Sequence, residues 1–123
     1  MYIGKLASAT GVTQKTIRHY EKLGLLPEPV RKGKYRFYNQ LDIQLIKMIK
    51  RAQSVGFSLA EISELAQIKA REQRFPLHIA LQLFAEKREK ILQKKAELDL
   101  ITTDLIQLEQ ELIQMYNIEN HTE

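Results

Sequence analysis

Residues 3–24 read IGKLASATGVTQKTIRHYEKLG, and this stretch decides the fold. Its first part has the apolar spacing of a short helix over residues 3–10, which Gly11 is expected to end. Thr13 is the expected N-cap of a second helix over residues 14–23, because its hydroxyl can accept a hydrogen bond from an N–H of the first turn. Two short helices joined by a glycine-centred turn predict a helix-turn-helix.

The second helix carries the polar side chains that a helix-turn-helix places in the major groove of DNA. Arg18 is the expected reader of a base edge, since a guanidinium can bind guanine through two hydrogen bonds; a phosphate contact is the alternative. Tyr20 is either a core residue or a phosphate ligand through its hydroxyl. The candidate DNA-binding residues of this helix are Lys15, Thr16, Arg18, His19 and Tyr20.

The segment VRKGKYRFY, residues 30–38, alternates apolar and basic residues around Gly33. This pattern predicts a small β-hairpin, called the wing below, which must lean on the helices because an isolated hairpin is marginally stable. Its side chains are expected to hold the DNA backbone and so to position the protein. Arg36 has the alternative role of tying the wing to a helix. The candidate contacts are Arg31, Lys34, Tyr35, Arg36 and Tyr38.

Two further helices complete the expected DNA-binding head, residues 1–70. Asn39 or Asp42 is expected to cap the third helix. Ser58, followed three residues later by Glu61, forms a capping box that opens the fourth.

Charge is divided unequally along the chain. The whole chain of 123 residues has a formal net charge of +4. Residues 1–74 hold fourteen basic and six acidic side chains, a net +8, whereas residues 75–123 hold five basic and nine acidic ones, a net −4. A basic first part indicates a partner that is a polyanion, although basic residues can also simply solubilise a surface.

After a charged connector, residues 71–76, no Gly or Pro occurs from residue 77 to residue 115. A helix of this length spans about 58 Å. Apolar residues recur in it at heptad spacing, and such a seam needs a partner helix, most economically a second copy of the chain; folding back on the head is the alternative. The expected dimerisation residues are Leu77, Phe84, Ile91, Leu98, Ile101, Leu105, Leu108 and Leu112.

Lys87 and Lys94 interrupt this seam and bear on its orientation. Parallel pairing would stack each lysine on its own copy. Antiparallel pairing would instead place the lysines opposite the acidic second half of the partner, so we expect an antiparallel coiled coil. The predicted fold class is therefore mainly α-helical: a winged helix-turn-helix head followed by a long dimerisation helix.

Three segments together resemble the MerR family of bacterial transcription regulators. They are TIRHYEKLGLLP at residues 16–27, KYRFY at residues 34–38 and AQSVGFSLAEI at residues 52–62. The resemblance covers residues 1–70 almost continuously, and the long helix stands where that family has its dimerisation helix. Two positions depart from the pattern: His19 replaces the usual Tyr or Phe, and Lys34 replaces the usual Gly of the wing.

The resemblance implies a homodimer that binds double-stranded promoter DNA. Such dimers bind a pseudo-palindrome within an over-long promoter spacer. In response to an effector they distort the spacer DNA, and they act on RNA polymerase indirectly, through the shape of the promoter. A stiff coiled coil would set the separation of the two heads, so a small change in it would strain the operator and cost DNA deformation energy.

The effector is open at this point. Metal-sensing relatives use cysteines near the two ends of the dimerisation helix, and this chain has no Cys. The matching places hold His78 and a tail, residues 116–123, that contains His121. Imidazole and carboxylate would suit Ni²⁺, Co²⁺ or Zn²⁺ as a bound metal. Alternatively, His78 is an ordinary histidine on the helix surface and His121 belongs to a frayed terminus, so that neither binds a metal. The effector would then be a small organic molecule or a stress signal.

Other functional classes are disfavoured. The chain has no Gly-rich phosphate loop, no paired-His helix motif and no Cys nucleophile, so it is not expected to be an enzyme. No apolar run reaches the roughly 18 residues of a membrane span, and a cytoplasmic protein is expected. The competing DNA-binding function is an architectural protein that bends DNA without any effector.

Overall fold

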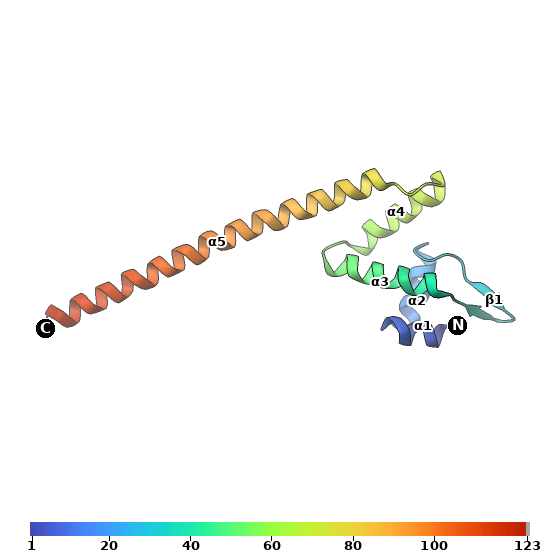
Figure 1. Cartoon of the computed structure of the whole chain (residues 1–123), viewed down its shortest axis with the longest axis horizontal. Helices are drawn as coiled ribbons and strands as arrows, with labels where there is room; N and C mark the ends of the chain where they lie inside the picture. The colour runs from blue at the N-terminus through green and yellow to red at the C-terminus, as the bar shows by residue number, and fades with distance from the viewer. Residues whose placement is uncertain (123) are drawn as a thin grey trace. The chain divides into compact units, whose positions relative to one another are not determined.

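The computed structural model describes the backbone of residues 1–122 and the side chains of residues 1–117. Within these residues the chain is mainly helical with one small hairpin, which confirms the predicted fold class (Figure 1). The elements in order are α1 (Ile3–Thr10), α2 (Gln14–Lys22), β1 (Val30–Lys32), β2 (Tyr35–Phe37), α3 (Gln40–Ser54), α4 (Leu59–Glu72) and α5 (Leu77–Thr122). Two compact units divide at residue 80, the first being Met1–Ala80.

The helix-turn-helix forms as the sequence predicts. Gly11 follows α1 with a φ of 73°, in the left-handed region where glycine carries no Cβ penalty. Thr13 caps α2, since its side chain accepts a hydrogen bond of 3.1 Å from the backbone N–H of Thr16. The turn between the two helices is thus set by local chemistry.

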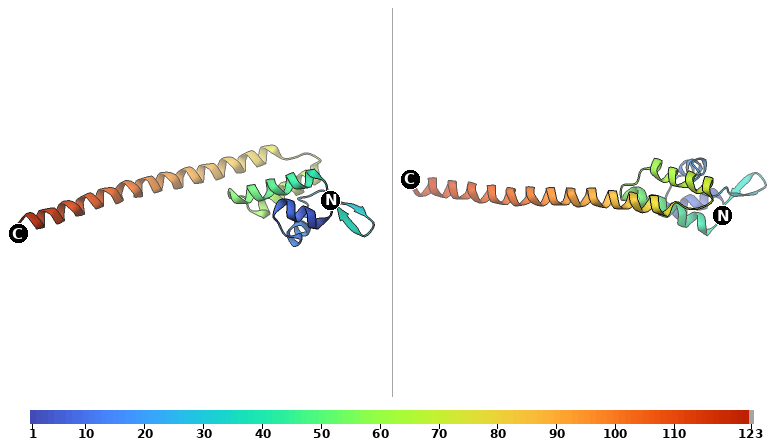
Figure 2. Two further views of the ribbon diagram at one scale, coloured as in Figure 1. Left: turned by 60° about the horizontal axis from the view of Figure 1, so that its bottom comes forward. Right: turned by 90° about the horizontal axis from the view of Figure 1, so that it is seen from above.

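β1 and β2 form the predicted wing. They pair antiparallel, with Val30 opposite Phe37 and Lys32 opposite Tyr35. Gly33 supplies the positive φ, 63°, that the tight turn requires. Figure 2 shows the hairpin extending away from the helices of its own unit.

The capping box predicted for α4 is present, and α3 begins with a second one. Asn39, rather than Asp42, is the N-cap of α3, and Asp42 completes the box by accepting from the Asn39 N–H at 2.9 Å. Ser58 and Glu61 form the reciprocal pair at the start of α4. These caps fix where the two helices begin.

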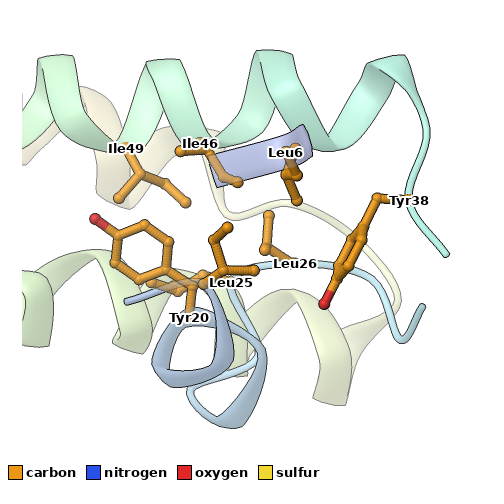
Figure 3. Close-up of a cluster of buried hydrophobic side chains, with 8 residues drawn as sticks. Leu6, Tyr20, Leu25, Leu26, Tyr38, Ile46 and Ile49 are labelled. Carbon is orange, nitrogen blue, oxygen red and sulfur yellow. The ribbon is translucent and has the colours of Figure 1, made fainter. Parts of the chain in front are cut away.

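The core of the first unit is formed by α1, α2 and α3 together with the segment that follows α2. Ile46 and Ile49 of α3 reach toward Leu25, Leu26 and the ring of Tyr20 (Figure 3). Prolines at residues 27 and 29 keep the segment between α2 and β1 from continuing as a helix. The whole cluster consists of Leu6, Ile17, Tyr20, Leu25, Leu26, Tyr38, Ile46 and Ile49.

α5 is continuous from Leu77 to Thr122 and so runs past Met115, where the heptad pattern predicted its end. The reason is that no Gly or Pro follows Met115 to stop it. The predicted seam is exposed in the single chain: Leu98 is 53 % exposed and Leu105 is 64 % exposed. In the part of the chain described here, no helix combines the length and the apolar character that crossing a membrane requires.

Candidate nucleic-acid interface

One face of α2 presents polar side chains, as the helix-turn-helix prediction requires. Lys15, Arg18 and His19 are exposed, whereas Ile17 on the opposite side is fully buried. Thr16 is half-buried, and its Oγ1 lies 2.9 Å from that of Thr13, so its hydroxyl already has a partner at the start of the helix.

Arg18 lies beside the wing. A hollow of about 410 Å³ brings it together with cations of the hairpin and with the aromatic residue that precedes α1. The lining residues are Tyr2, Ile3, Arg18, Lys34, Tyr35 and Arg36. Arg31 is also exposed on the wing, where its Nη1 donates to the carbonyl oxygen of Lys34 at 3.4 Å. Helix and wing together thus form one basic surface.

Glu21 joins the wing to α2. The Nε of Arg36 donates to Oε2 of Glu21 at 2.9 Å, and the hydroxyl of Tyr38 donates to Oε1. The alternative role considered for Arg36, tying the wing to a helix, is therefore the one observed. Burial first, and the hydrogen bond to Glu21 second, raise the pKa of Tyr38 above its ordinary value.

Two of the predicted DNA contacts belong instead to the core. Tyr38 is 2 % exposed, and Tyr20 is 4 % exposed with its hydroxyl donating to Oε1 of Gln53 at 3.2 Å. Burial also raises the pKa of Tyr20. Of the two roles left open for Tyr20, the structure shows the core one, and we remove both tyrosines from the candidate contact surface. The period-two alternation around Gly33 did not predict that Tyr38, the residue after β2, is buried.

Comparison with known proteins bears on this surface. The family model described as MerR HTH family regulatory protein matches residues 1–69, and the model described as MerR, DNA binding, matches residues 43–115. The chain belongs to the MerR family. Because this is a family of regulatory proteins, the expectation that the chain is not an enzyme is confirmed.

Three relatives illustrate how far the similarity extends. The mercuric resistance operon regulatory protein of Bacillus cereus is 47 % identical over 72 residues, which cover 58 % of this chain and 54 % of that protein. The crystal structure of MerR from Bacillus megaterium MB1 with mercury(II) is 37 % identical, with a TM-score of 0.59 and coverage of 89 % and 85 %. HiNmlR, a MerR family regulator lacking the sensor domain and bound to promoter DNA, is 26 % identical, with a TM-score of 0.61 and coverage of 80 % and 75 %. The chain spans about half the length of the mercuric resistance regulators it matches.

His19 lines a second hollow on the head of this MerR protein. The hollow measures about 600 Å³ and lies between α2 and α4, with Leu59 and Glu64 on its α4 side. Across it, Ser63 donates to the carbonyl oxygen of Leu23 at 3.4 Å. The residue that departs from the usual aromatic of the family therefore faces α4 as well as solvent.

Of the predicted metal ligands of this MerR chain, the structure describes the side chain of His78 alone. His78 is exposed in the first turn of α5, and His121 lies outside the side chains that the structure describes. Among the side chains of residues 1–117, no three His, Asp or Glu residues form a cluster that could hold a metal ion. A metal site built from these residues would need a second copy of the chain.

Two residues that hold the wing in place, Glu21 and Tyr2, are not among the candidates predicted from the sequence. Glu21 had a signal, because it is the one acidic residue in the otherwise basic α2. Tyr2 had none, because it precedes the first helix and takes part in no periodic pattern. Both act through contacts with the wing, which is distant from them in the sequence.

Proposed function

We propose that this chain is a transcription regulator that binds promoter DNA as a homodimer through α2 and the wing. The observation that carries the proposal is the joint surface of Arg18 and Lys34, which places one cation from α2 and one from the wing around the same hollow. Phosphate neutralisation by such cations supplies the sequence-independent part of DNA affinity. The relative described as bound to promoter DNA supports the same partner.

We expect the residues of this surface to contact either DNA phosphates or base edges, depending on how close they lie to the wing. Arg18 shares its hollow with wing cations that are expected to hold the DNA backbone, which favours its phosphate role over its base-reading role. Lys15 and His19 are exposed on α2 away from Glu21 and remain as the candidates for contacts with base edges. Arg31 and Tyr35 would add backbone contacts from the wing.

Titration of labelled duplexes selected from a randomised library tests this division. Lys34→Ala and Arg18→Ala should each weaken all duplexes alike and flatten the dependence of log K on log salt by about one. Lys15→Ala should change base preference instead. Lys90→Ala, which removes an exposed cation from α5, is the matched control and should leave binding unchanged.

Two outcomes would revise the assignment. Relaxed base preference with an unchanged salt slope in Arg18→Ala would restore its base-reading role. Wild-type affinity and preference in both Arg18→Ala and Lys34→Ala would remove the hollow from the interface.

Regulation by promoter distortion is the finer part of the proposal. In this mechanism the dimer affects RNA polymerase indirectly, by changing the shape of an over-long promoter spacer. An architectural protein would bend DNA without changing the amount of transcript. Transcription in vitro from matched templates with normal and lengthened spacers separates the two. Stimulation confined to the lengthened spacer supports regulation, and bending without any change in transcription supports the architectural function.

A borderline divalent cation is the effector we propose to test first. The absence of Cys removes the thiolate ligands that suit Hg²⁺ and leaves imidazole and carboxylate donors, which suit Ni²⁺, Co²⁺ or Zn²⁺. An antiparallel dimer would bring His78 of one chain toward the end of α5 of the other, where His121 lies. Isothermal titration of Ni²⁺ and Zn²⁺ into wild type and His78→Ala should show binding that the variant loses. No heat above buffer in wild type would contradict a metal effector and favour an organic or stress signal.

A further inference from the structure

The wing is too short to hold its own orientation. Each of its strands has three residues, and an isolated two-stranded hairpin is marginally stable at best. Its angle relative to α2 must therefore be set by contacts with other parts of the head. Since successive side chains of a strand point to opposite faces, those contacts divide into two sets.

The first set of contacts lies on the Arg36 face of β2. Arg36 is held by Glu21 of α2 at 2.9 Å, as described above. This contact connects the wing to the helix that is proposed to enter the major groove.

The second set lies on the opposite face and involves Tyr2. The ring of Tyr2 meets the rings of Tyr35 and Phe37 edge to face, with centroids 6.1 Å and 5.3 Å apart and interplanar angles of 75° and 79°. Aromatic pairs prefer this arrangement. The Nζ of Lys32 lies 3.9 Å from the centroid of the Phe37 ring, which adds a cation–π contact from β1.

The backbone holds Tyr2 in this place. The N–H of Tyr38 donates to the carbonyl oxygen of Met1 at 2.7 Å, so the segment before α1 lies beside the end of β2. The carbonyl oxygen of Tyr2 itself accepts from the N–H groups of Lys5 and Leu6 at the start of α1. Tyr2 is thus anchored to α1 and to the wing together.

We propose that Tyr2 is a positioning residue for DNA binding, one that braces the wing so that Arg18 and Lys34 face the same stretch of DNA backbone. Tyr2, Arg18 and Lys34 line one hollow, so a shift of the hairpin changes the distance between the two cations. The inference rests on the proposed DNA-binding function. It assigns the effect to the ring, because the ring makes the contacts with Tyr35 and Phe37.

The test compares Tyr2→Ala with Tyr2→Phe in duplex titrations at several salt concentrations. Tyr2→Ala should weaken binding about tenfold and flatten the salt dependence by about one, because one cation loses its phosphate. Tyr2→Phe keeps the ring and should bind within about twofold of wild type. Met48→Ala removes another large exposed side chain, on α3, and should change neither quantity.

A second measurement follows the wing without DNA. Tyr2→Ala should raise the backbone mobility of Gly33 and Lys34 in ¹⁵N relaxation, whereas Tyr2→Phe should not. If Tyr2→Ala loses its helical circular dichroism, Tyr2→Leu takes its place, since leucine keeps apolar bulk without a ring edge and should show the same losses in smaller measure.

Each contrary result has a distinct meaning. Wild-type affinity and salt slope in Tyr2→Ala would overturn the positioning role while leaving DNA binding intact. Equal losses in Tyr2→Phe and Tyr2→Ala would overturn it in favour of a direct contact of the hydroxyl with phosphate. A wild-type protein that binds no duplex would overturn the proposed function and this inference with it.

Discussion

Glu21 is the residue on which the link between wing and α2 depends. Its side chain is 11 % exposed and accepts from both Arg36 and Tyr38. Glu21→Ala would leave the buried Tyr38 hydroxyl without an acceptor, at a cost of about 1–3 kcal/mol in the free energy of unfolding. Urea denaturation followed by circular dichroism measures this loss.

Two further variants serve as comparisons for Glu21→Ala in the urea denaturation. Glu21→Gln keeps an acceptor oxygen but loses the charge, so it should be less destabilising than Glu21→Ala. Glu28→Ala removes an exposed carboxylate and should leave the midpoint unchanged. An unchanged midpoint in Glu21→Ala would show that the contact adds no net stability.

Tyr38 makes the stability of the protein sensitive to high pH. Its folded-state pKa is raised above the ordinary value of 10.0. Above pH 10.0 the unfolded chain releases the phenol proton while the folded protein keeps it, so the free energy of unfolding falls as pH rises. Below that value both states hold the proton and the contribution is complete. Tyr20, whose pKa is raised by burial, acts in the same direction.

Denaturation at a series of pH values on both sides of 10.0 checks this dependence. Tyr38→Phe should make the decline shallower than in wild type, because one of the linked protons is gone. Tyr35→Phe is the matched control, since Tyr35 is 67 % exposed and should leave the decline as it is. If the free energy of unfolding of Tyr38→Phe falls with pH as steeply as that of wild type, groups other than Tyr38 cause the decline.

The helices of the head owe their boundaries to caps, and these can be tested one at a time. Ser58→Ala removes the side chain that accepts from the Glu61 N–H at 3.1 Å. The expected cost is about 1 kcal/mol, as is typical for the loss of an N-cap. Ser8→Ala, an exposed serine inside α1, should cause no loss because alanine favours helix interiors. Thermal denaturation of both variants distinguishes the effect of the cap from that of losing any serine.

Elements with local causes are the ones that the sequence predicts well. Caps such as Thr13 and Ser58 and the glycine at the wing turn act within a few residues, so their spacing reveals them. Contacts between distant segments leave no such trace. Tyr20 and Tyr38 are buried, and their hydroxyls donate to Gln53 and Glu21, partners that only the packed structure brings to them.

At the scale of the whole molecule, α5 presents an apolar seam that is largely exposed among the side chains that the structure describes. Phe84 is 48 % exposed, Ile91 is 58 % exposed and Leu112 is 64 % exposed, all at heptad positions. A long helix with an exposed heptad seam is stable in water when a second helix covers it. We therefore expect Leu105→Glu to shift the protein from dimer to monomer in sedimentation velocity, and a wild-type protein that sediments as a 14.4 kDa monomer at micromolar concentration would contradict the homodimer.

The orientation of the two α5 helices can be tested by cross-linking, because the chain has no Cys of its own and an engineered Cys can pair only with another engineered Cys. An antiparallel pair that covers the whole seam centres the two heptad regions, residues 77–115, on each other and so places residue 84 opposite residue 108 of the partner. Phe84→Cys in one copy should then form a disulfide with Leu108→Cys in the other. In a parallel pair these two positions are about 36 Å apart along the axis, far beyond the roughly 7 Å between Cα atoms that a disulfide allows. Mixed single-cysteine proteins, oxidised and run on non-reducing gels, should give only the mixed dimer. Efficient cross-linking of each variant to itself would instead show a parallel pair, and Lys87 and Lys94 would then have to be accommodated against their own copies inside the seam.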